Sequence, residues 1–302
     1  MPLRLLLATL VVTLALVACD SDESSDRATD DNSQPVGTLT FAFQPQENPD
    51  GLQLDVERFA EFIGERTNHE VEVFLPTNYA SVVEALRSGN ADIAYFSGLP
   101  YLHAHEKAGV ELLVVEERDG NPFYYSQWYA LADSDIEELA DLKGRSIAFT
   151  SPSSTSGFLF PLAEVIDQGL LEKGGDPQAF FDTVLYAGGY QQALMALVHG
   201  RVEAAAASDY ALQTYLSEED QARLKVIARQ GPVPTHGLAI HPDIDDELKE
   251  AIRDALLELN EEEHRDLLTS VYGAEKLVVQ DHEEHVSALR RAYELVDLDS
   301  TL

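Results

Sequence analysis

The chain has 302 residues and a formal net charge of −34, from 54 acidic and 20 basic residues. A surface this acidic repels nucleic acid and anionic lipid, which excludes proteins that bind either one through their charge. One cysteine in the whole chain excludes intrachain disulfides. The length suffices for one large domain or for two lobes of ordinary size, each with a core.

The N-terminal residues are typical of an exported lipoprotein. Arg4 is followed by an apolar run, residues 5–17, that is too short for a membrane span and reads as a signal peptide. The run ends in Leu-Val-Ala-Cys, which resembles a bacterial lipobox, so we expect residues 1–18 to be removed and Cys19 to carry lipid. Residues 19–35 are acidic and lack aromatic side chains, as in a disordered tether. The protein is therefore predicted to lie outside the cytoplasmic membrane, in the periplasm or at the cell surface, anchored by lipid.

After this tether, strand and helix patterns alternate along the chain, which favours an α/β fold with mainly parallel sheets. Residues 245–295 are strongly helical and charged. The apolar runs 128–132 and 237–241 separate two sets of elements and are interpreted as the crossovers of a hinge. The main predicted elements are strands at 39–43, 71–75, 92–96, 183–186 and 224–228, and a helix at 52–66.

Two segments of the chain, residues 79–97 and 190–208, match each other without gaps at six identical positions. Each begins with a tyrosine, contains a glycine in the same place and ends with a serine. Each predicts an amphipathic helix, a glycine C-cap and a buried strand. The tyrosines and serines then fall at the carboxyl ends of strands, where open α/β sheets bind ligands. The repeat predicts two similar lobes that face a shared cleft.

A hydroxyl-rich turn, Ser153 to Gly157, lies between a strand at 145–149 and a helix at 158–166. Such a turn presents backbone N–H groups at the positive end of a helix dipole, which can hold an oxyanion without lysine or arginine. Serine and threonine hydroxyls add donors. The alternative is that Ser154 or Ser156 only caps the helix. The turn matches neither usual nucleotide-binding fingerprint, so no nucleotide is expected.

Taken together, these motifs resemble the periplasmic solute-binding proteins of the phosphonate, phosphite and phosphate uptake family. The resemblance covers nearly all of the chain after the tether, and Ser154–Leu159 is its most specific part. The other matching segments are Phe43–Pro49, Pro76–Tyr79, Val83–Leu86, Asp92–Phe96, Gly120–Pro122 with Tyr124 and Ser126, Ala187–Tyr190 and Ser208–Asp209.

The resemblance implies a type II periplasmic binding protein, with two α/β lobes joined by a two-strand hinge around a ligand cleft. Lobe 1 would comprise residues 36–128 and 237–302, and lobe 2 residues 129–236. The protein would capture a phosphorus oxyanion by closing the cleft and would then deliver it to the permease subunits of an ABC importer. We expect a monomer that is not an enzyme and that needs no cofactor.

The resemblance also implies roles for particular residues. Ser154, Thr155 and Ser156 would hold the phosphoryl oxygens, while Tyr79 would donate its hydroxyl from the opposite lobe. Tyr95, with Phe96, would form an aromatic wall. Tyr190 stands where many members of the family carry histidine and can still donate to an oxyanion.

Asp209 would accept a hydrogen bond from a protonated ligand oxygen, because an ionised carboxylate only accepts. A fully deprotonated anion such as sulfate would then be rejected. The alternatives are that Asp209 caps a helix at 210–216 and that Tyr79 and Tyr190 only pack between the lobes.

Other functions fit the sequence less well. A metal site needs three or four convergent ligands, and the pairs His103/His105 and His282/His285 have no evident companions, so no metal is expected. A serine hydrolase would need a G-x-S-x-G elbow, which the serine turn lacks. A binding protein for a sulfonate or a thiamine precursor, or a ligand-sensing lipoprotein, remains the alternative.

Overall fold

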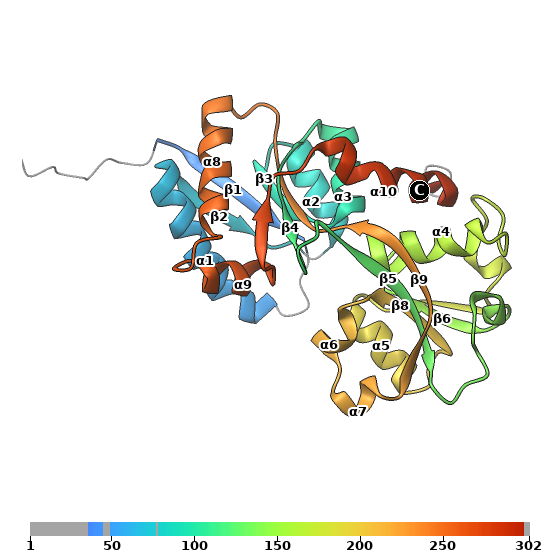
Figure 1. The fold of residues 1–302 in the computed structure, drawn as a ribbon. Helices are drawn as coiled ribbons and strands as arrows, with labels where there is room; N and C mark the ends of the chain where they lie inside the picture. Colours follow the sequence, from blue (N-terminus) through green and yellow to red (C-terminus); the bar gives the residue numbers. More distant parts are fainter. Residues whose placement is uncertain (1–35, 45–48, 77, 299–302) are drawn as a thin grey trace, which may run out of the picture. The chain divides into compact units, whose positions relative to one another are not determined.

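The computed structural model describes residues 36–44, 49–76 and 78–298. The predicted signal peptide, Cys19 and the predicted tether lie outside the described residues. The described chain folds into two α/β lobes, each built on its own sheet (Figure 1). Lobe 1 is named here for the six-stranded sheet and lobe 2 for the five-stranded sheet.

The sheet of lobe 1 has the strand order β11-β4-β10-β3-β1-β2. The three neighbouring strands β2, β1 and β3 are parallel, whereas β10 and β11 are antiparallel to their neighbours. The strands are β1 (Thr38–Phe43), β2 (Glu70–Phe74), β3 (Ile93–Phe96), β4 (Glu111–Glu117), β10 (Gly237–Ile240) and β11 (Lys276–Val278).

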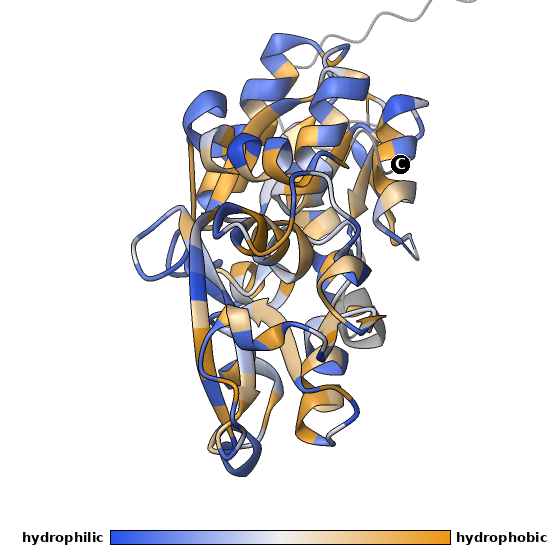
Figure 2. Ribbon diagram, turned by 90° about the vertical axis from the view of Figure 1, so that its right-hand side faces the viewer, coloured by the Kyte–Doolittle hydropathy of each residue, from blue (hydrophilic) through white to orange (hydrophobic). Residues whose placement is uncertain are grey.

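Helices cover both faces of this sheet because its strands are apolar on both sides. Side chains alternate along a strand, so Phe41 packs in one buried cluster and its neighbour Ala42 in another. Hydrophobic residues accordingly concentrate in the strands and on the inner sides of the helices (Figure 2). One face carries α1 (Pro49–Thr67), α8 (Asp246–Glu258) and α9 (Arg265–Tyr272), and the other carries α2 (Tyr79–Arg87) and α3 (Gly98–Ala108).

The sheet of lobe 2 repeats this plan with the order β7-β6-β8-β5-β9. Its first three strands are parallel, and β5 is antiparallel to both β8 and β9. The strands are β5 (Phe123–Leu131), β6 (Ser146–Phe149), β7 (Thr183–Tyr186), β8 (Ala204–Ser208) and β9 (Leu224–Pro234). The helices are η1 (Leu139–Leu142), a π-helical turn η2 (Thr155–Leu159), α4 (Phe160–Asp167), η3 (Pro177–Ala179), α5 (Tyr190–Val198), α6 (Ala211–Tyr215) and α7 (Glu218–Gln221).

The expected fold of two α/β lobes is confirmed, but the expectation of mainly parallel sheets is wrong. Both sheets are mixed, because β5 and β10 each enter a sheet after the chain has crossed from the other lobe. A strand that enters from the crossing side runs against the parallel strands beside it.

The crossings lie earlier in the chain than the sequence suggested. The chain passes between the sheets at residues 118–122 and 235–236, whereas the apolar runs at 128–132 and 237–241 contribute to paired strands. The first crossing contains Gly120 and Pro122, which break regular structure. Thr235 ties the two crossings together, since its hydroxyl donates to the carbonyl oxygens of Glu116 (2.7 Å) and Pro122 (3.0 Å).

The last helix, α10 (His282–Val296), spans the two lobes (Figure 1). It follows a lobe 1 strand in the chain but packs against α4 and β9 of lobe 2 as well as α3. Its buried face, which includes Leu289 and Val296, joins the same apolar cluster as Leu162 of α4. The C-terminal residues, which the sequence assigned to lobe 1 alone, therefore also complete the surface of lobe 2.

The repeat predicted from the sequence is present in the fold. Helices α2 and α5 each contain nine residues and each begins with the expected tyrosine. Gly89 and Gly200 follow the helices with φ of +71° and +66°. This left-handed conformation is readily available only to glycine and explains why it is the punctuating residue in both segments.

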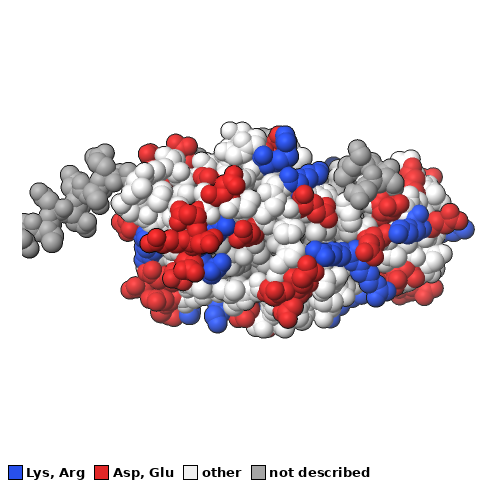
Figure 3. Space-filling model, turned by 90° about the horizontal axis from the view of Figure 1, so that it is seen from above, with Lys and Arg blue, Asp and Glu red and all other residues white. Residues whose placement is uncertain are grey.

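No helix within the described part of the chain is long and apolar enough to cross a membrane. Acidic side chains spread over the face shown in Figure 3, with lysine and arginine interspersed among them. The excess of acidic residues thus lies on the solvated surface.

Candidate functional site

A cavity of about 220 Å³ is bounded by both lobes and by the second crossing. Gln44, Tyr79 and Ser97 follow β1, β2 and β3, while Thr150 and Tyr190 follow β6 and β7. The cavity therefore lies at the carboxyl ends of the parallel strands of both sheets, the usual ligand site of open α/β folds. Its lining residues are Gln44, Tyr79, Ser97, Thr150, Ser154, Gly188, Gly189, Tyr190, Gln192, Tyr210, Tyr215 and His236.

The serine turn contributes one side chain to this lining and two to the structure behind it. Ser154 lines the cavity and also caps the helix, because its Oγ accepts a hydrogen bond of 3.0 Å from the Gly157 N–H. Its own hydroxyl proton stays available for donation. Thr155 Oγ1 accepts the N–H of Leu99 in lobe 1 at 2.9 Å. The hydroxyl of Thr155 thus links the two lobes, whereas the sequence predicted that it would bind the ligand directly.

Ser156 lies at the centre of a neutral hydrogen-bonded group, here called the hydroxyl network. Its Oγ is 2.9 Å from the hydroxyl of Tyr124 and 2.5 Å from that of Tyr190. Burial raises the pKa of both phenols, so they are neutral and can donate. Ser156 does not line the cavity, but it positions Tyr190, which does.

Thr150 is a lining residue that the sequence did not suggest. Its Oγ1 is buried and has no hydrogen-bond partner among the described residues. A buried hydroxyl without a partner costs free energy unless a ligand or water satisfies it. Gly157 permits this position, since a Cβ there would lie 2.2 Å from Thr150 Oγ1. The sequence alone could not show that the serine turn packs closely against the end of β6, and this packing is what identifies Thr150 as a lining residue.

The structure places Tyr95 and Asp209 away from the cavity. Tyr95 is buried, and its hydroxyl donates to Glu116 and lies 2.9 Å from Nδ1 of His236. Asp209 lies 3.5 Å from Arg229 and lines a different cavity. It does not cap α6, whose N-cap is Tyr210. The following residue, Tyr210, is the one that reaches the cavity.

Four residues beside the cavity form what is here called the charged network: Tyr95, Glu116, Arg118 and His236. The Glu116 side chain is fully buried, and its Oε2 accepts from Nε (3.0 Å) and Nη2 (2.8 Å) of Arg118. Burial would lower the pKa of Arg118, but the adjacent Glu116 holds it raised. Glu116 is the second-last residue of β4 and His236 lies on the return crossing, so the network joins the two passages between the lobes.

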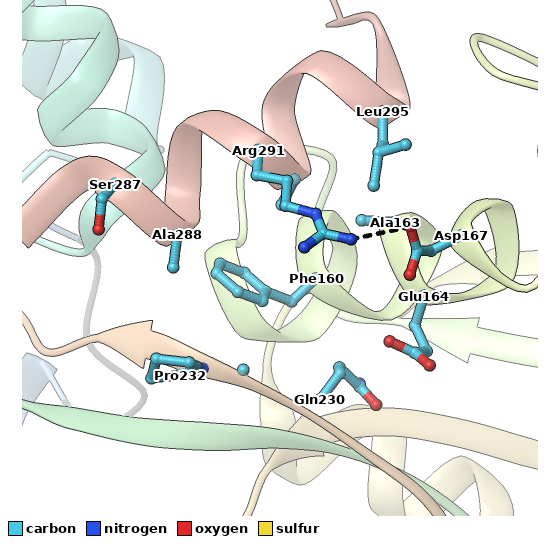
Figure 4. A pocket seen from close by; sticks show the side chains of 12 residues that line it. Phe160, Ala163, Glu164, Asp167, Gln230, Pro232, Ser287, Ala288, Arg291 and Leu295 are labelled. Carbon is cyan, nitrogen blue, oxygen red and sulfur yellow. Dashed lines mark hydrogen bonds and ion pairs between the residues drawn. The ribbon is translucent and has the colours of Figure 1, made fainter.

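Two of the larger cavities contain carboxylates and fit an oxyanion less well. One of about 480 Å³ lies between α4, β9 and α10 (Figure 4). Its arginine, Arg291, is paired with Asp167 at 3.2 Å, and Glu164 also lines it. The other, of about 520 Å³, contains Asp209 and Arg229, which pair with each other. Carboxylates on both linings would repel an anion.

One histidine of each pair contacts one of the other, contrary to the expectation that the pairs have no companions. The rings of His105 on α3 and His282 on α10 lie 4.1 Å apart, and Tyr101 contacts His282 and His285. Within residues 36–44, 49–76 and 78–298, no three His, Cys, Asp or Glu side chains converge to hold a metal ion. The histidines instead pack α10 against α3.

Comparison with protein families places this geometry in context. Residues 41–285 match the model of a family described as the periplasmic substrate-binding protein of ABC phosphonate transporters. The chain is 29% identical over 255 residues to the phosphate-import protein PhnD of Mycolicibacterium smegmatis, covering 80% of this chain and 78% of that protein. It is also 29% identical over 128 residues to the phosphonates-binding periplasmic protein of Escherichia coli, covering 41% of this chain and 38% of that protein.

Solved structures share the fold. A binding protein component of an ABC phosphonate transporter from Pseudomonas aeruginosa is similar with a TM-score of 0.72 and 23% identity, covering 86% of both chains. PhnD1 of Prochlorococcus marinus in complex with methylphosphonate is similar with a TM-score of 0.72 and 17% identity, covering 86% of this chain and 98% of that one. At these identities the likeness concerns the arrangement of the two lobes.

Proposed function

Since the chain belongs to the family of periplasmic substrate-binding proteins of ABC phosphonate transporters, we propose that its cargo is a phosphorus oxyanion, held in the cavity of about 220 Å³. The candidates are phosphonates, phosphite and phosphate. The relatives are named for phosphate and phosphonates, which supports this class.

The lining of the cavity carries the proposal. Apart from His236, its polar side chains are neutral and can donate, including the hydroxyls of Thr150, Ser154 and Tyr190, and neither lysine nor arginine is among them. Thr150 Oγ1 has no partner among the described residues. Neutral donors can replace the water molecules that hydrate each oxygen of an oxyanion. A buried unpaired hydroxyl favours a ligand that accepts a hydrogen bond from it.

Capture would proceed by closure of the lobes around this cavity. The two crossings, at residues 118–122 and 235–236, would act as the hinge. The protein would bind its ligand without changing it and release it to the permease. We further propose that lipid on Cys19 and a tether over residues 19–35 keep the two lobes near the membrane. The lobe boundaries are proposed at these crossings, with α10 shared between the lobes.

Isothermal titration calorimetry of the purified protein tests the proposal. The ligands are phosphate, phosphite, methylphosphonate, 2-aminoethylphosphonate and, as controls, sulfate and methanesulfonate. We expect tight binding of at least one phosphorus oxyanion and weak binding of sulfate. Thr150→Val keeps the shape of the side chain but removes the hydroxyl, and should weaken binding by about 10-fold or more.

Other outcomes have clear meanings. If the sulfonate binds and no phosphorus compound does, the ligand class proposed here is wrong. Equal affinity of Thr150→Val and wild type would move the site away from this cavity. Phosphorus NMR of the ligand after prolonged incubation should show one unchanged signal, and a new product signal would contradict binding without turnover.

A further inference from the structure

Among the residues that line the cavity, His236 has a side chain whose proton position is fixed by the protein. Its Nδ1 lies 2.9 Å from the hydroxyl oxygen of Tyr95. That hydroxyl has one proton and donates it to Glu116. The Tyr95 oxygen can therefore only accept from His236, so Nδ1 carries the ring proton.

Nε2 of His236 is consequently a bare acceptor. A neutral imidazole has one N–H and one lone-pair nitrogen, and burial lowers the pKa of His236, which keeps the ring neutral. Nε2 has no hydrogen-bond partner among the described residues. Since Nδ1 is engaged with Tyr95, Nε2 is the nitrogen left for an occupant of the cavity that His236 lines.

We propose that His236 detects a proton on the ligand: its Nε2 accepts a hydrogen bond from the hydroxyl of a singly protonated phosphorus oxyanion. The inference rests on the proposed function and specifies the form of the ligand that binds. The other polar side chains of the lining can supply donors for deprotonated oxygens, whereas Nε2 requires a donor. An anion without a proton, such as sulfate, would place an oxygen lone pair against the lone pair of Nε2.

The protein holds this arrangement rigidly. Glu116 is kept in place by two hydrogen bonds from Arg118, and the His236 side chain is only 14% exposed. Three consecutive hydrogen bonds would then connect the ligand hydroxyl to Glu116: ligand to Nε2, Nδ1 to Tyr95, and Tyr95 to Glu116. The titratable or charged groups that act on the His236 ring are Tyr95, Glu116, Arg118, Tyr124 and His285.

Two substitutions separate this role from a structural one. His236→Asn retains an amide N–H at the Nδ1 position for Tyr95 but has no atom at the Nε2 position. His236→Gln can bring an amide oxygen to the Nε2 position. We expect His236→Asn to bind methylphosphonate about 10-fold or more weakly than wild type, and His236→Gln to recover part of that loss. If His236 only supports Tyr95, the asparagine variant will bind as tightly as wild type.

Proton uptake provides a second readout in the unmodified protein. Calorimetry in buffers of different ionisation enthalpy counts the protons taken up on binding. At a pH where the free ligand is a dianion, the wild type should take up close to one proton per ligand, because the bound form carries one proton. Binding with no proton uptake at a pH where the free ligand is dianionic would overturn the inference.

Nitrogen NMR of His236 covers the case in which neither variant folds. The wild type without ligand should show a protonated Nδ1 and a bare Nε2, and methylphosphonate should shift the Nε2 signal. An Nε2-protonated ring would overturn the inference. Failure of the wild type to bind any phosphorus oxyanion removes the proposed function and the inference with it, whereas binding that is unchanged in His236→Asn removes the inference alone.

Discussion

The two walls of the cavity are stabilised by different chemistry. On the side of lobe 1 and the crossings, the charged network contains a fully buried carboxylate paired with Arg118. On the side of lobe 2, the hydroxyl network of Tyr124, Ser156 and Tyr190 contains no charge. The lobes share a fold, so the difference arises from side chains rather than from topology.

This difference suggests a division of labour. A buried ion pair is costly to break because either partner alone is left uncompensated, so the charged network should fix the geometry of the crossings. Neutral hydroxyls can reorient their protons, so the hydroxyl network can adapt its donors to the ligand. The charged wall should therefore govern stability, and the neutral wall, together with Nε2 of His236, should govern affinity.

The most severe test removes the buried carboxylate. Glu116→Ala leaves the half-buried Arg118 without its carboxylate partner and should lower the free energy of unfolding by about 3–5 kcal/mol. Denaturant unfolding measures this loss. Glu117→Gln, on the next and less buried residue of β4, should change stability by less than about 0.5 kcal/mol. Equal losses of stability in the two variants would show that the Glu116–Arg118 ion pair does not contribute more to stability than an ordinary surface residue.

The pH dependence of stability should also come from the lobe 1 side. Burial of His285, between α10 and Tyr101, lowers its pKa from 6.5 to about 4. The unfolded chain binds the proton first, so stability should fall as pH drops from about 6.5 to about 4, by up to roughly 3 kcal/mol. The histidine's contribution is fully present above this window.

His285→Gln should remove that part of the pH dependence, as measured by unfolding across the acid range. His199→Gln, at an exposed position, is the matched control and should leave it intact. A wild-type stability that is flat over this window would contradict the assignment.

On the neutral wall, Gly157→Ala should disturb the site through packing. The new Cβ would lie 2.2 Å from Thr150 Oγ1, so we expect a loss of about 1–3 kcal/mol in stability and weaker ligand binding. Adding Thr150→Ala removes the two nearest colliding atoms, Oγ1 and Cγ2, and should restore part of the stability, which a double-mutant cycle measures. Gly37→Ala, whose Cβ would be 3.5 Å from His69, should be nearly neutral.

The smallest effect is expected for Tyr190→Phe. It removes one hydrogen bond of the hydroxyl network and one donor from the cavity, so binding should weaken by about 1 kcal/mol while the pH dependence of stability stays unchanged. Calorimetric titration and acid unfolding of the same variant test both parts. A changed pH profile would show that the hydroxyl network is coupled to the groups that titrate on the lobe 1 side.

Much of the fold could be predicted from local patterns. The helices that begin at Tyr79 and Tyr190, and the glycines that end them, follow from periodicity and from the φ that only glycine tolerates. The antiparallel entry of β5 and β10 could not be predicted, because it depends on where the chain crosses between lobes. Long apolar runs look alike whether they form a crossing or a buried strand.

The site was only partly predictable for a related reason. Ser154, Tyr79 and Tyr190 follow strands directly, so topology carries them to the cavity. Thr150 also follows a strand, β6, but its importance depends on the close approach of Gly157, which leaves its hydroxyl buried and without a partner among the described residues. His236 was missed because its role depends on hydrogen bonds through Tyr95. The sequence could not show that the Asp209 side chain points away from the cavity. A shift of one residue after a strand turns a side chain to the other side, and Arg229 pairs with Asp209 outside the cavity.

The net charge of −34 has a consequence for how quickly the cavity fills. An anion must approach against the field of the whole molecule, so electrostatics slows its diffusional encounter instead of guiding it. Dissolved ions confine that field to about 8 Å at physiological ionic strength and to about 3 Å in molar salt. The protein should therefore collect an anionic cargo fastest where salt is abundant, in contrast to the many carriers whose association slows as salt is added.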